Sequence, residues 1–492
     1  MIGKVMDMLG DFFSDKRMEE RISWFIIISV VAVITFFILY RADWMLGDNL
    51  HFVLYTGKGN VYPLFTPFKV GETRFFPFAW IDLNLLLLVP GGTSAFAHYM
   101  YAAFSFVVFC LFFLLSCKKI CKDYRIRYGL YFAVVAFVLA VFNTGFFDCF
   151  LNLMYPDRYV VILFAAFAFL MLRYRECGKT YLLVLAFACA FFSTYCKETV
   201  FAFFVVYAVW TLFFQKECSR QEKIFMYSLI VNGVVFLLMY YLLAWRGHSV
   251  VYAKDAPMGI LQLCSTVFRN SALLLFVFIF SIVRFFKCLV SKGKSLPVID
   301  PLIAASAVYA LEYFVLGYSS TYYYAPAVTA GAIPVVLYAS RIVSEHRYAG
   351  TAILMLLLLV PVAHFASVSS CINNTVMERI KVMPGLRHMA SLQRQGGKIY
   401  WFNPANDLDV TYSLVNTYIN FINKTDDVDY LVKIYDMPEL DRNDVFLYTL
   451  NSSTLKIPVY PAILQSLGQN KFVLFQYQTG FLVFMHEDNL KL

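Results

Sequence analysis

The chain has 492 residues, of which 60% are hydrophobic and 15% are charged, whereas soluble globular proteins are about 45–50% apolar and about 25% charged. A mean hydropathy of +0.65, with 51 Phe and 34 Tyr, excludes disordered, collagen-like and disulfide-scaffold proteins. The net charge of +9 is more typical of basic loops at an anionic membrane surface than of nucleic-acid binding, so no nucleic-acid partner is expected.

The first 21 residues predict a helix that lies on the cytoplasmic surface of the membrane. Ile2, Val5, Met6 and Leu9 recur at helical spacing, with charged residues between them. This segment lacks the continuous apolar core and the small-residue cleavage site of a signal peptide, so we do not expect it to be cleaved.

Residues 22–370 predict a polytopic α-helical membrane domain. A membrane-spanning helix needs about 20 consecutive apolar residues, and eleven runs of roughly that length are separated by charged breaks. They are residues 22–40, 96–116, 128–147, 158–172, 180–195, 198–214, 224–244, 263–284, 298–316, 325–341 and 349–369.

The distribution of Lys and Arg predicts the orientation. With the N-terminus in the cytoplasm, the inner segments carry 21 basic residues and the outer loops carry eight, although the first outer loop (41–95) is long. Positively charged loops stay in the cytoplasm. We therefore expect a bacterial inner-membrane protein whose N-terminus is cytoplasmic and whose C-terminal part is extracytoplasmic.

The composition changes at residue 371, and residues 371–492 predict a small extracytoplasmic α/β domain. Strand-like runs occur at 398–402, 430–435, 445–450 and 471–485, and the last run contains a Gln-Thr-Gly turn at 478–480 that is typical of a hairpin. A capped segment at 406–423 has helical periodicity.

The ionisable residues gather at the outer ends of the predicted helices and leave the membrane midplane almost free of charge. A transporter is expected to keep ionisable groups near mid-depth. This distribution favours an enzyme that handles a lipid-anchored, phosphate-bearing substrate at one interface. The residues are Asp43, Asp48, Glu72, Arg74, Asp82, Asp148, Asp157, Arg158, Lys197, Glu198, Arg246, Asp255, Arg269 and Glu312.

The first outer loop places two carboxylates soon after the first span and continues into the apolar stretch Phe78–Val89. That stretch is too short to cross a bilayer and predicts a helix along the membrane surface. With the many spans and the C-terminal domain, this layout resembles the GT-C superfamily of polyprenyl-phosphate-sugar-dependent glycosyltransferases. The likeness extends to YPDRYV (155–160), CKET (196–199) and the Tyr-rich SSTYYYAPAV (319–328), although no Arg precedes these tyrosines as in several members.

The resemblance implies an inverting glycosyltransferase, a hexosyl- or pentosyltransferase, that moves a monosaccharide from a polyprenyl-phosphate donor to an extracytoplasmic glycan, lipid or protein acceptor. Its general base would be a first-loop acid. Asp48, in GDNLHF, is the first candidate and Asp43 the second. In the purely structural interpretation, Asp48 caps the following helix and Asp43 pairs with Arg41.

The departing phosphate requires preorganised cations. The candidates are Arg74, Lys197, Arg158, Arg246 and Arg269. Each can instead be an ordinary basic residue at a helix end that reaches lipid headgroups, and Lys197 with Glu198 or Asp157 with Arg158 can be a local ion pair.

Six further residues are candidates for lining the substrate groove. They are Asp157, Glu198, Glu312, Tyr322, Tyr323 and Tyr324. Interfacial tyrosines also occur without any function, and Glu312 can be a packed carboxyl group. Because Asp157 or Glu198 could bind a divalent cation, Mg or Mn is a possible cofactor. Two separated carboxylates are, however, only weak evidence for a metal site.

Two other functions remain open from the sequence. One is a flippase or transporter of lipid-linked sugars. The other is an enzyme of the O-antigen polymerase or ligase type, although such enzymes place their large outer loop between late helices, whereas here it comes first.

Overall fold

The computed structural model of the chain describes residues 16–45, 77–89, 94–126, 128–153, 155–243, 260–290, 295–318, 320–402, 410–425, 428–434, 438–449, 461–478 and 481–490. The chain divides into two compact units. The helical unit comprises Met1–Leu39, Pro63–Gly92 and Ala97–Ile372, and the C-terminal unit comprises Tyr40–Tyr62, Thr93–Phe96 and Asn373–Leu492.

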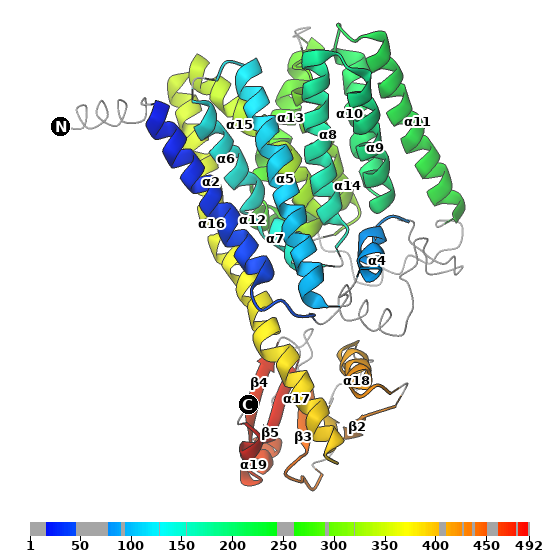
Figure 1. Ribbon diagram of the computed structural model, residues 1–492. Helices are drawn as coiled ribbons and strands as arrows, with labels where there is room; N and C mark the ends of the chain where they lie inside the picture. Colours follow the sequence, from blue (N-terminus) through cyan, green and yellow to red (C-terminus); the bar gives the residue numbers. More distant parts are fainter. Residues whose placement is uncertain are drawn as a thin grey trace, which may run out of the picture. The chain divides into compact units, whose positions relative to one another are not determined.

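Helices occupy all eleven apolar runs predicted from the sequence (Figure 1). The helices are α2 (Lys16–Leu39), α4 (Ile81–Leu87), α5 (Ala95–Asp123), α6 (Gly129–Val141), α7 (Thr144–Leu151), α8 (Asp157–Cys177), α9 (Thr180–Cys196), α10 (Val200–Phe214), α11 (Arg220–Leu243), α12 (Ile260–Asn270), α13 (Leu273–Val290), α14 (Ile299–Val315), η3 (Thr321–Tyr324), α15 (Ala325–Glu345) and α16 (Arg347–Met377). Residues 1–15 of the predicted surface helix lie outside the described residues, and residues 16–21 belong to α2.

By length and composition, six helices of the described chain can cross a membrane, or seven if the bent pair α6–α7 forms one span. These helices make the chain an integral membrane protein. Helices α9 and α10 are apolar but shorter. The total of eleven spans and the orientation of the termini therefore stay predictions.

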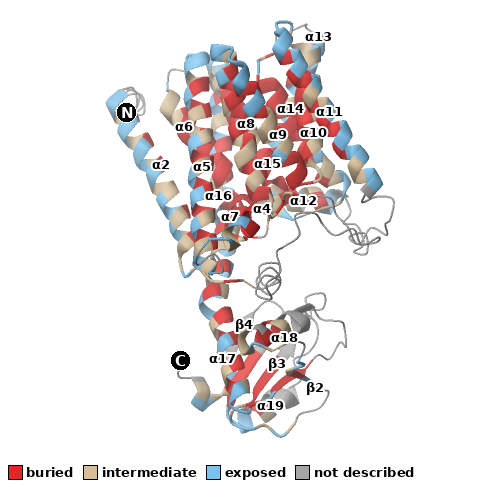
Figure 2. Ribbon diagram, turned by 45° about the vertical axis from the view of Figure 1, so that its right-hand side comes forward, coloured by how far each residue is buried: buried red, intermediate tan, exposed pale blue. Residues whose placement is uncertain are grey.

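Burial separates the central helices of this unit from the peripheral ones (Figure 2). The apolar window of Thr321–Glu345 is 72% buried, whereas that of α2 is only 22% buried. Phe25 on α2 and Leu238 on α11 are among the large apolar side chains that remain exposed. An apolar surface of this extent suits contact with lipid tails rather than water.

Two of the predicted runs are broken into two helices each. The run at 128–147 bends by 69° between α6 and α7. Asn143 makes this break, because its side-chain oxygen accepts a hydrogen bond from the Phe146 N–H at 2.9 Å and so caps α7. The run at 263–284 is interrupted between α12 and α13 at Ser271 and Ala272.

Helix α6 receives its N-terminal cap from another helix. Its own N-cap residue, Tyr128, contributes no side-chain hydrogen bond. Instead, Glu19 of α2 accepts hydrogen bonds from the N–H groups of Leu130 at 2.9 Å and Tyr131 at 3.4 Å. These N–H groups have no partner within α6, since the first turn of a helix leaves its donors unpaired.

The C-terminal unit contains the strands predicted from the sequence, joined in one five-stranded sheet of order β2-β1-β3-β5-β4. The strands are β1 (Ile399–Phe402), β2 (Leu431–Ile434), β3 (Val445–Thr449), β4 (Phe472–Gln478) and β5 (Phe481–His486). β1 pairs in parallel with β2 and β3, and the other pairs are antiparallel. The turn residues 479–480 lie outside the described residues.

Three α-helices accompany this sheet: α17 (Met383–Arg394), α18 (Val410–Asn423) and α19 (Pro461–Gln469). A π-helical turn, Glu378–Val382, precedes α17, and the 3₁₀ turn η5 (Glu487–Leu490) follows β5. Tyr400, Phe402, Phe446 and Phe484 of the sheet pack with Leu467 of α19 and form a core. Whether this unit is extracytoplasmic remains a prediction.

Candidate active site

One end of the helical unit gathers several of the predicted site residues. They come from the start of α8, the turn between α9 and α10, and η3. The turn between α9 and α10 is short, because α9 ends at Cys196 and α10 begins at Val200. We name Asp82, Asp157, Arg158, Lys197, Tyr322 and Tyr323 the outer-end cluster.

The first part of the outer-end cluster is a buried ion pair beside aromatic rings. The Lys197 Nζ donates to Asp157 Oδ2 at 3.0 Å, and both side chains are almost completely buried. The same ammonium lies 4.4 Å from the centre of the Tyr323 ring and 5.6 Å from that of Tyr322. Tyr322 in turn stacks on Tyr155 at 3.9 Å.

The second part is a less complete ion pair. Arg158 is fully buried, and its Nη2 lies 3.4 Å from Asp82 Oδ2 on α4. The Tyr159 hydroxyl donates to the same carboxylate oxygen and accepts a hydrogen bond from Arg158. Within the described chain, Nε and Nη1 of Arg158 and Oδ1 of Asp82 have no hydrogen-bond partner.

Burial also changes the acidity of Asp82. This residue is on α4, which with seven residues is too short to span the membrane. Desolvation disfavours the charged carboxylate and raises the pKa of Asp82 to about 6, although the neighbouring Arg158 acts in the opposite direction. Asp82 therefore changes charge close to neutral pH.

The tyrosine-bearing turn η3 is held in place by α7. A side chain at Gly145 would put its Cβ 2.2 Å from the Thr321 carbonyl oxygen, so the close approach of the two backbones requires glycine. The Thr321 hydroxyl donates to Asp148 Oδ2 at 2.7 Å, and the Cys371 thiol lies 3.0 Å from the other oxygen of Asp148. Tyr323 also stacks on Tyr313 of α14 at 4.8 Å.

An apolar cavity of about 910 Å³ begins at the residues that follow Lys197. It lies between α10, α11 and α14, and its lining includes Phe236, Leu238 and Leu311. Glu198, Thr199 and Glu312 are its polar lining residues apart from two tyrosines. Glu312 Oε2 has no hydrogen-bond partner among the residues that the structure describes.

Several site residues predicted from the sequence fall elsewhere. Asp48, Arg74 and Arg246 lie outside the described residues. Arg269 is exposed in the last turn of α12. Tyr324 is buried, and its hydroxyl donates to the Tyr318 carbonyl oxygen at 2.6 Å.

Asp43 belongs to the C-terminal unit, and its ion-pair partner there is Arg387. One Arg387 nitrogen, Nη2, donates to both Asp43 oxygens, at 2.5 and 2.6 Å. The local pairing with Arg41 that the sequence suggested is thus replaced by a partner 344 residues further along the chain.

Sequence reasoning missed Asp82, Tyr159 and Asp148 as site residues. Asp82 did give a signal, because it is an acid within an apolar surface helix. Its partner Arg158 is 76 residues away, and nothing in the local sequence connects the two. Asp148 gave a weaker signal, because it was only one of many charges near the outer helix ends.

A metal site does not fit the described residues. No group of three or more His, Cys, Asp or Glu side chains in this part of the chain is arranged to hold a metal ion. Asp157 and Asp82, the carboxylates of the outer-end cluster, are each already bound to a cationic side chain.

No protein-family model and no curated protein sequence matches the chain. Among solved structures, it is similar to ArnT from Cupriavidus metallidurans bound to undecaprenyl phosphate, with 10% identity and a TM-score of 0.48 over 93% of this chain and 97% of that chain. It is also similar to the Archaeoglobus fulgidus oligosaccharyltransferase tethered with an acceptor peptide, with 12% identity and a TM-score of 0.45 over 84% of this chain and 64% of that chain.

A third similar structure is the archaeal oligosaccharyltransferase AglB from Archaeoglobus fulgidus in complex with an inhibitory peptide and a dolichol-phosphate. It has 10% identity and a TM-score of 0.47, over 82% of this chain and 64% of that chain. These three similarities extend over 82–93% of this chain. At such low identities and TM-scores they assign no role to any residue, so those roles rest on this chain's own geometry.

Proposed function

We propose that the protein is an integral-membrane, inverting glycosyltransferase that transfers a monosaccharide from a polyprenyl-phosphate donor to an extracytoplasmic glycan, lipid or protein acceptor. The observation that carries this proposal is the position of Lys197. It is a buried cation, and the next two residues line a large apolar cavity.

The outer-end cluster supplies positive charge for the donor phosphate. Arg158 has two nitrogens without a described partner, and a buried N–H donor that makes no hydrogen bond is costly unless a ligand accepts from it. The Lys197 ammonium adds a second cation near the tyrosines of η3. Charge-assisted hydrogen bonds to phosphate are about twice as strong as neutral ones.

The apolar cavity is suited to the isoprenoid chain of the donor. Its lining is largely aliphatic and aromatic, and two of the helices beside it, α10 and α11, expose further apolar side chains outside the lining. Glu198 and Glu312 are the charged residues in this lining. The phosphate would therefore lie at the Lys197 end and the lipid tail between α10, α11 and α14.

The reaction needs a base for the acceptor hydroxyl. The acceptor oxygen loses its proton to this base and attacks the anomeric carbon, while the bond from that carbon to the phosphate oxygen breaks and the polyprenyl phosphate leaves with the electron pair. Asp48 and Asp43 are the bases that the sequence resemblance implies. Asp82 is a third candidate, since a base works best when its pKa is near the operating pH.

Transfer of a radiolabelled sugar from a purified polyprenyl-phosphate donor tests the proposal. We expect the single variants Lys197→Gln and Arg158→Gln to lose transfer, whereas Lys216→Gln, an exposed lysine in the α10–α11 loop, keeps it. Asp48→Asn, Asp43→Asn and Asp82→Asn identify the base, because the loss should be largest for the residue that takes the proton.

The same assay separates the rival functions. Net movement of the lipid-linked sugar across liposomes without transfer would make the protein a flippase. Activity with diphosphate but not monophosphate donors would place it with polymerases and ligases. Full activity of all three aspartate variants would refute base catalysis by these residues.

A further inference from the structure

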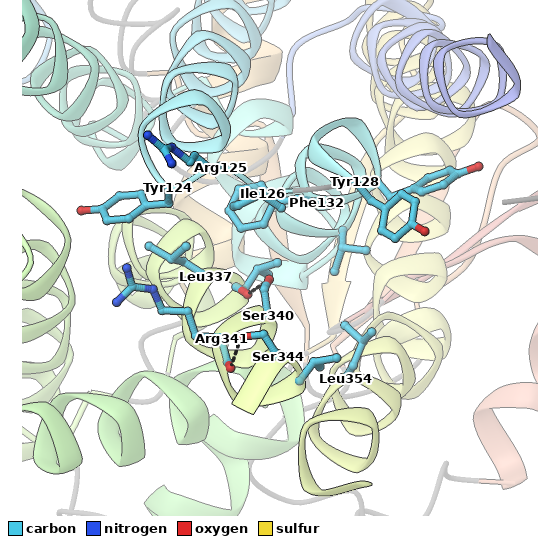
Figure 3. A pocket seen from close by; sticks show the side chains of 14 residues that line it. Tyr124, Arg125, Ile126, Tyr128, Phe132, Leu337, Ser340, Arg341, Ser344 and Leu354 are labelled. Atoms are coloured by element: carbon cyan, nitrogen blue, oxygen red, sulfur yellow. Dashed lines mark hydrogen bonds between the residues drawn. The ribbon is translucent and has the colours of Figure 1, made fainter. Parts of the chain in front are cut away.

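A second pocket lies at the opposite end of α15 from η3. It has a volume of about 680 Å³ and is lined by the turn that follows α5 and by α6, α15 and α16 (Figure 3). Its apolar lining includes Phe132, Leu337 and Leu354. This pocket is separate from the outer-end cluster, because none of its lining residues belongs to that cluster.

Two arginines give this pocket a positive charge. The Arg341 guanidinium lies 5.0 Å from the centre of the Tyr124 ring, and Arg125 is the next residue along the chain from that tyrosine. In the view of Figure 3, both guanidinium groups are on the same side of the pocket as Tyr124. The hydroxyls of Ser340 and Ser344 donate to carbonyls of their own helix, and the arginines are the charged residues of the lining.

Three other basic residues near this end of the helices are already neutralised by carboxylates. Lys122 and Arg173 pair with Glu176, and Arg175 pairs with Glu222. Within the described part of the chain, no carboxylate lies within ion-pair distance of Arg125 or Arg341. The charge of the pocket is therefore available to an external anion.

The backbone at Arg125 gives a second reason to assign this side chain a role. Arg125 has a φ of 50°, in the left-handed region that usually holds glycine at a helix end. Its neighbour Ile126 donates to the Cys121 carbonyl oxygen at 3.0 Å, which completes the turn that ends α5. A non-glycine residue in this conformation is strained, and such positions concentrate at functional sites.

We propose that this pocket binds an anionic phospholipid, with the lipid phosphate between Arg125 and Arg341 and an acyl chain along Phe132, Leu337 and Leu354. Basic pockets between membrane helices bind anionic headgroups on the cytoplasmic side, and the basic residues of the sequence assign this end of the helices to that leaflet. The site is independent of the proposed transferase activity.

Native mass spectrometry of the full-length protein in detergent tests the proposal, with phosphatidylglycerol, phosphatidylcholine or inorganic phosphate added separately. The test variant is Arg125→Gly/Arg341→Gln, since glycine relieves the backbone strain while it removes the guanidinium. The control is Lys216→Gln/Lys223→Gln, which removes two exposed charges at the same end. Thermal unfolding confirms that both variants are folded.

We expect phosphatidylglycerol to be retained over phosphatidylcholine by the native protein and the control. The test variant should bind it about 25-fold more weakly, because each basic residue near the lipid contributes a factor of about 5. Equal retention by the test variant and the control overturns the proposal. Displacement of the lipid by an excess of inorganic phosphate overturns it too, because the pocket would then hold only a free anion.

Discussion

Two buried arginines in the helical unit are paired in different ways. Arg284 on α13 donates to Asp300 on α14 through Nε at 2.8 Å and Nη2 at 2.6 Å. The contact is bidentate, because each carboxylate oxygen accepts one of these hydrogen bonds. The same carboxylate accepts from the Leu296 N–H and the Tyr338 hydroxyl. Arg158 makes one 3.4 Å contact with Asp82, and its Nε and Nη1 have no partner among the described residues.

Under the proposed function, the difference separates a structural ion pair from one that binds the donor phosphate. A buried ion pair stabilises a fold only when its geometry is good and its remaining donors and acceptors are satisfied. Arg284 and Asp300 meet this condition, whereas Arg158 and Asp82 do not. We infer that Arg284 serves the fold and that Arg158 is kept for the chemistry.

The largest change in the free energy of unfolding is expected when the ion pair between Arg284 and Asp300 is broken. Arg284→Gln leaves Asp300 buried without its cation and should lower the free energy of unfolding by about 3–5 kcal/mol. The double variant Arg284→Met/Asp300→Leu should recover much of this loss, because it removes both charges. Denaturant unfolding in detergent micelles measures both, and transfer activity per folded molecule should not change.

A loss of activity is expected at the other pair. Arg158→Gln should lower kcat about 10²–10³-fold, the range seen when one preorganised donor to a developing charge is removed. Its unfolding should change much less than that of Arg284→Gln. If Arg158→Gln instead keeps its activity and loses as much stability as Arg284→Gln, the two arginines are alike and the comparison fails.

The pH dependence of stability tests the environment of Asp82. Since its pKa is raised from 3.8 to about 6, the folded state binds the proton more tightly than the unfolded state. The stabilisation of the folded state by the proton on Asp82 is fully present below pH 3.8. It is lost as the pH rises through about 6. We expect this loss to be about 3 kcal/mol. Thermal unfolding of the native protein at pH values between 3.8 and about 6 should show this loss of stability. The Asp82→Asn variant should not show it.

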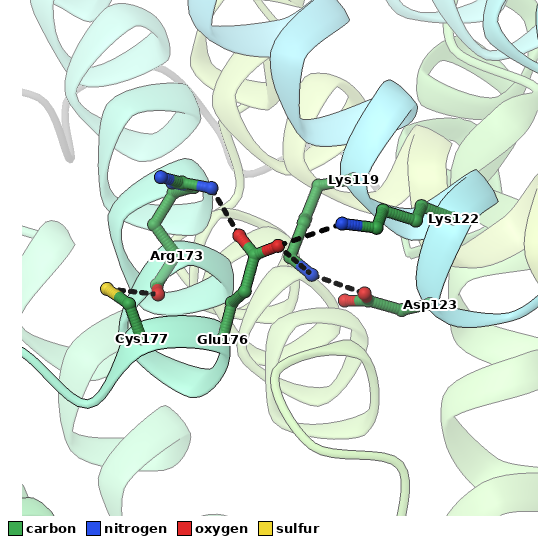
Figure 4. Close-up of polar contacts among 6 residues, drawn as sticks. All are labelled: Lys119, Lys122, Asp123, Arg173, Glu176 and Cys177. Atoms are coloured by element: carbon green, nitrogen blue, oxygen red, sulfur yellow. Dashed lines mark hydrogen bonds and ion pairs between the residues drawn. The ribbon is translucent and has the colours of Figure 1, made fainter.

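The smallest effect is expected in the exposed charges at the other end of α8. Glu176 accepts there from Lys122 and Arg173 and lies near Lys119 (Figure 4). Lys122 is 74% exposed, and exposed ion pairs contribute little because water screens them. Lys122→Ala should leave both the unfolding midpoint and the activity unchanged within error. A clear loss of stability or activity in Lys122→Ala would show that burial does not explain why the Arg284 and Arg158 pairs matter more than the Glu176 pairs.

Hydropathy predicted the helices well, because each apolar run must avoid water, either by packing inside the protein or by facing lipid. It did not predict the break at Asn143, although asparagine followed by threonine is a helix-capping signal. The strand positions in residues 371–492 also followed from local patterns. The order β2-β1-β3-β5-β4 did not, since it depends on pairing between distant segments.

Three charged residues of the outer-end cluster could be singled out from the sequence, but their ion-pair partners could not. Lys197, Arg158 and Asp157 stood out because they are charged at the ends of apolar helices. The sequence offered local partners for them, whereas the fold joins Asp157 to Lys197 and Arg158 to Asp82. The burial that gives Asp82 its raised pKa is a property of the packed helices and has no local sequence signal.

The cap that Glu19 provides for α6 links the start of the chain to the order of its assembly. Glu19 precedes Leu130 by 111 residues, so its carboxylate is synthesised before the N–H group that it accepts from. Deleting the residues before Arg21 would remove Glu19, so the N–H groups of Leu130 and Tyr131 would lose this acceptor. Besides being able to cross a membrane, α2 therefore supplies a hydrogen-bond acceptor to the start of α6.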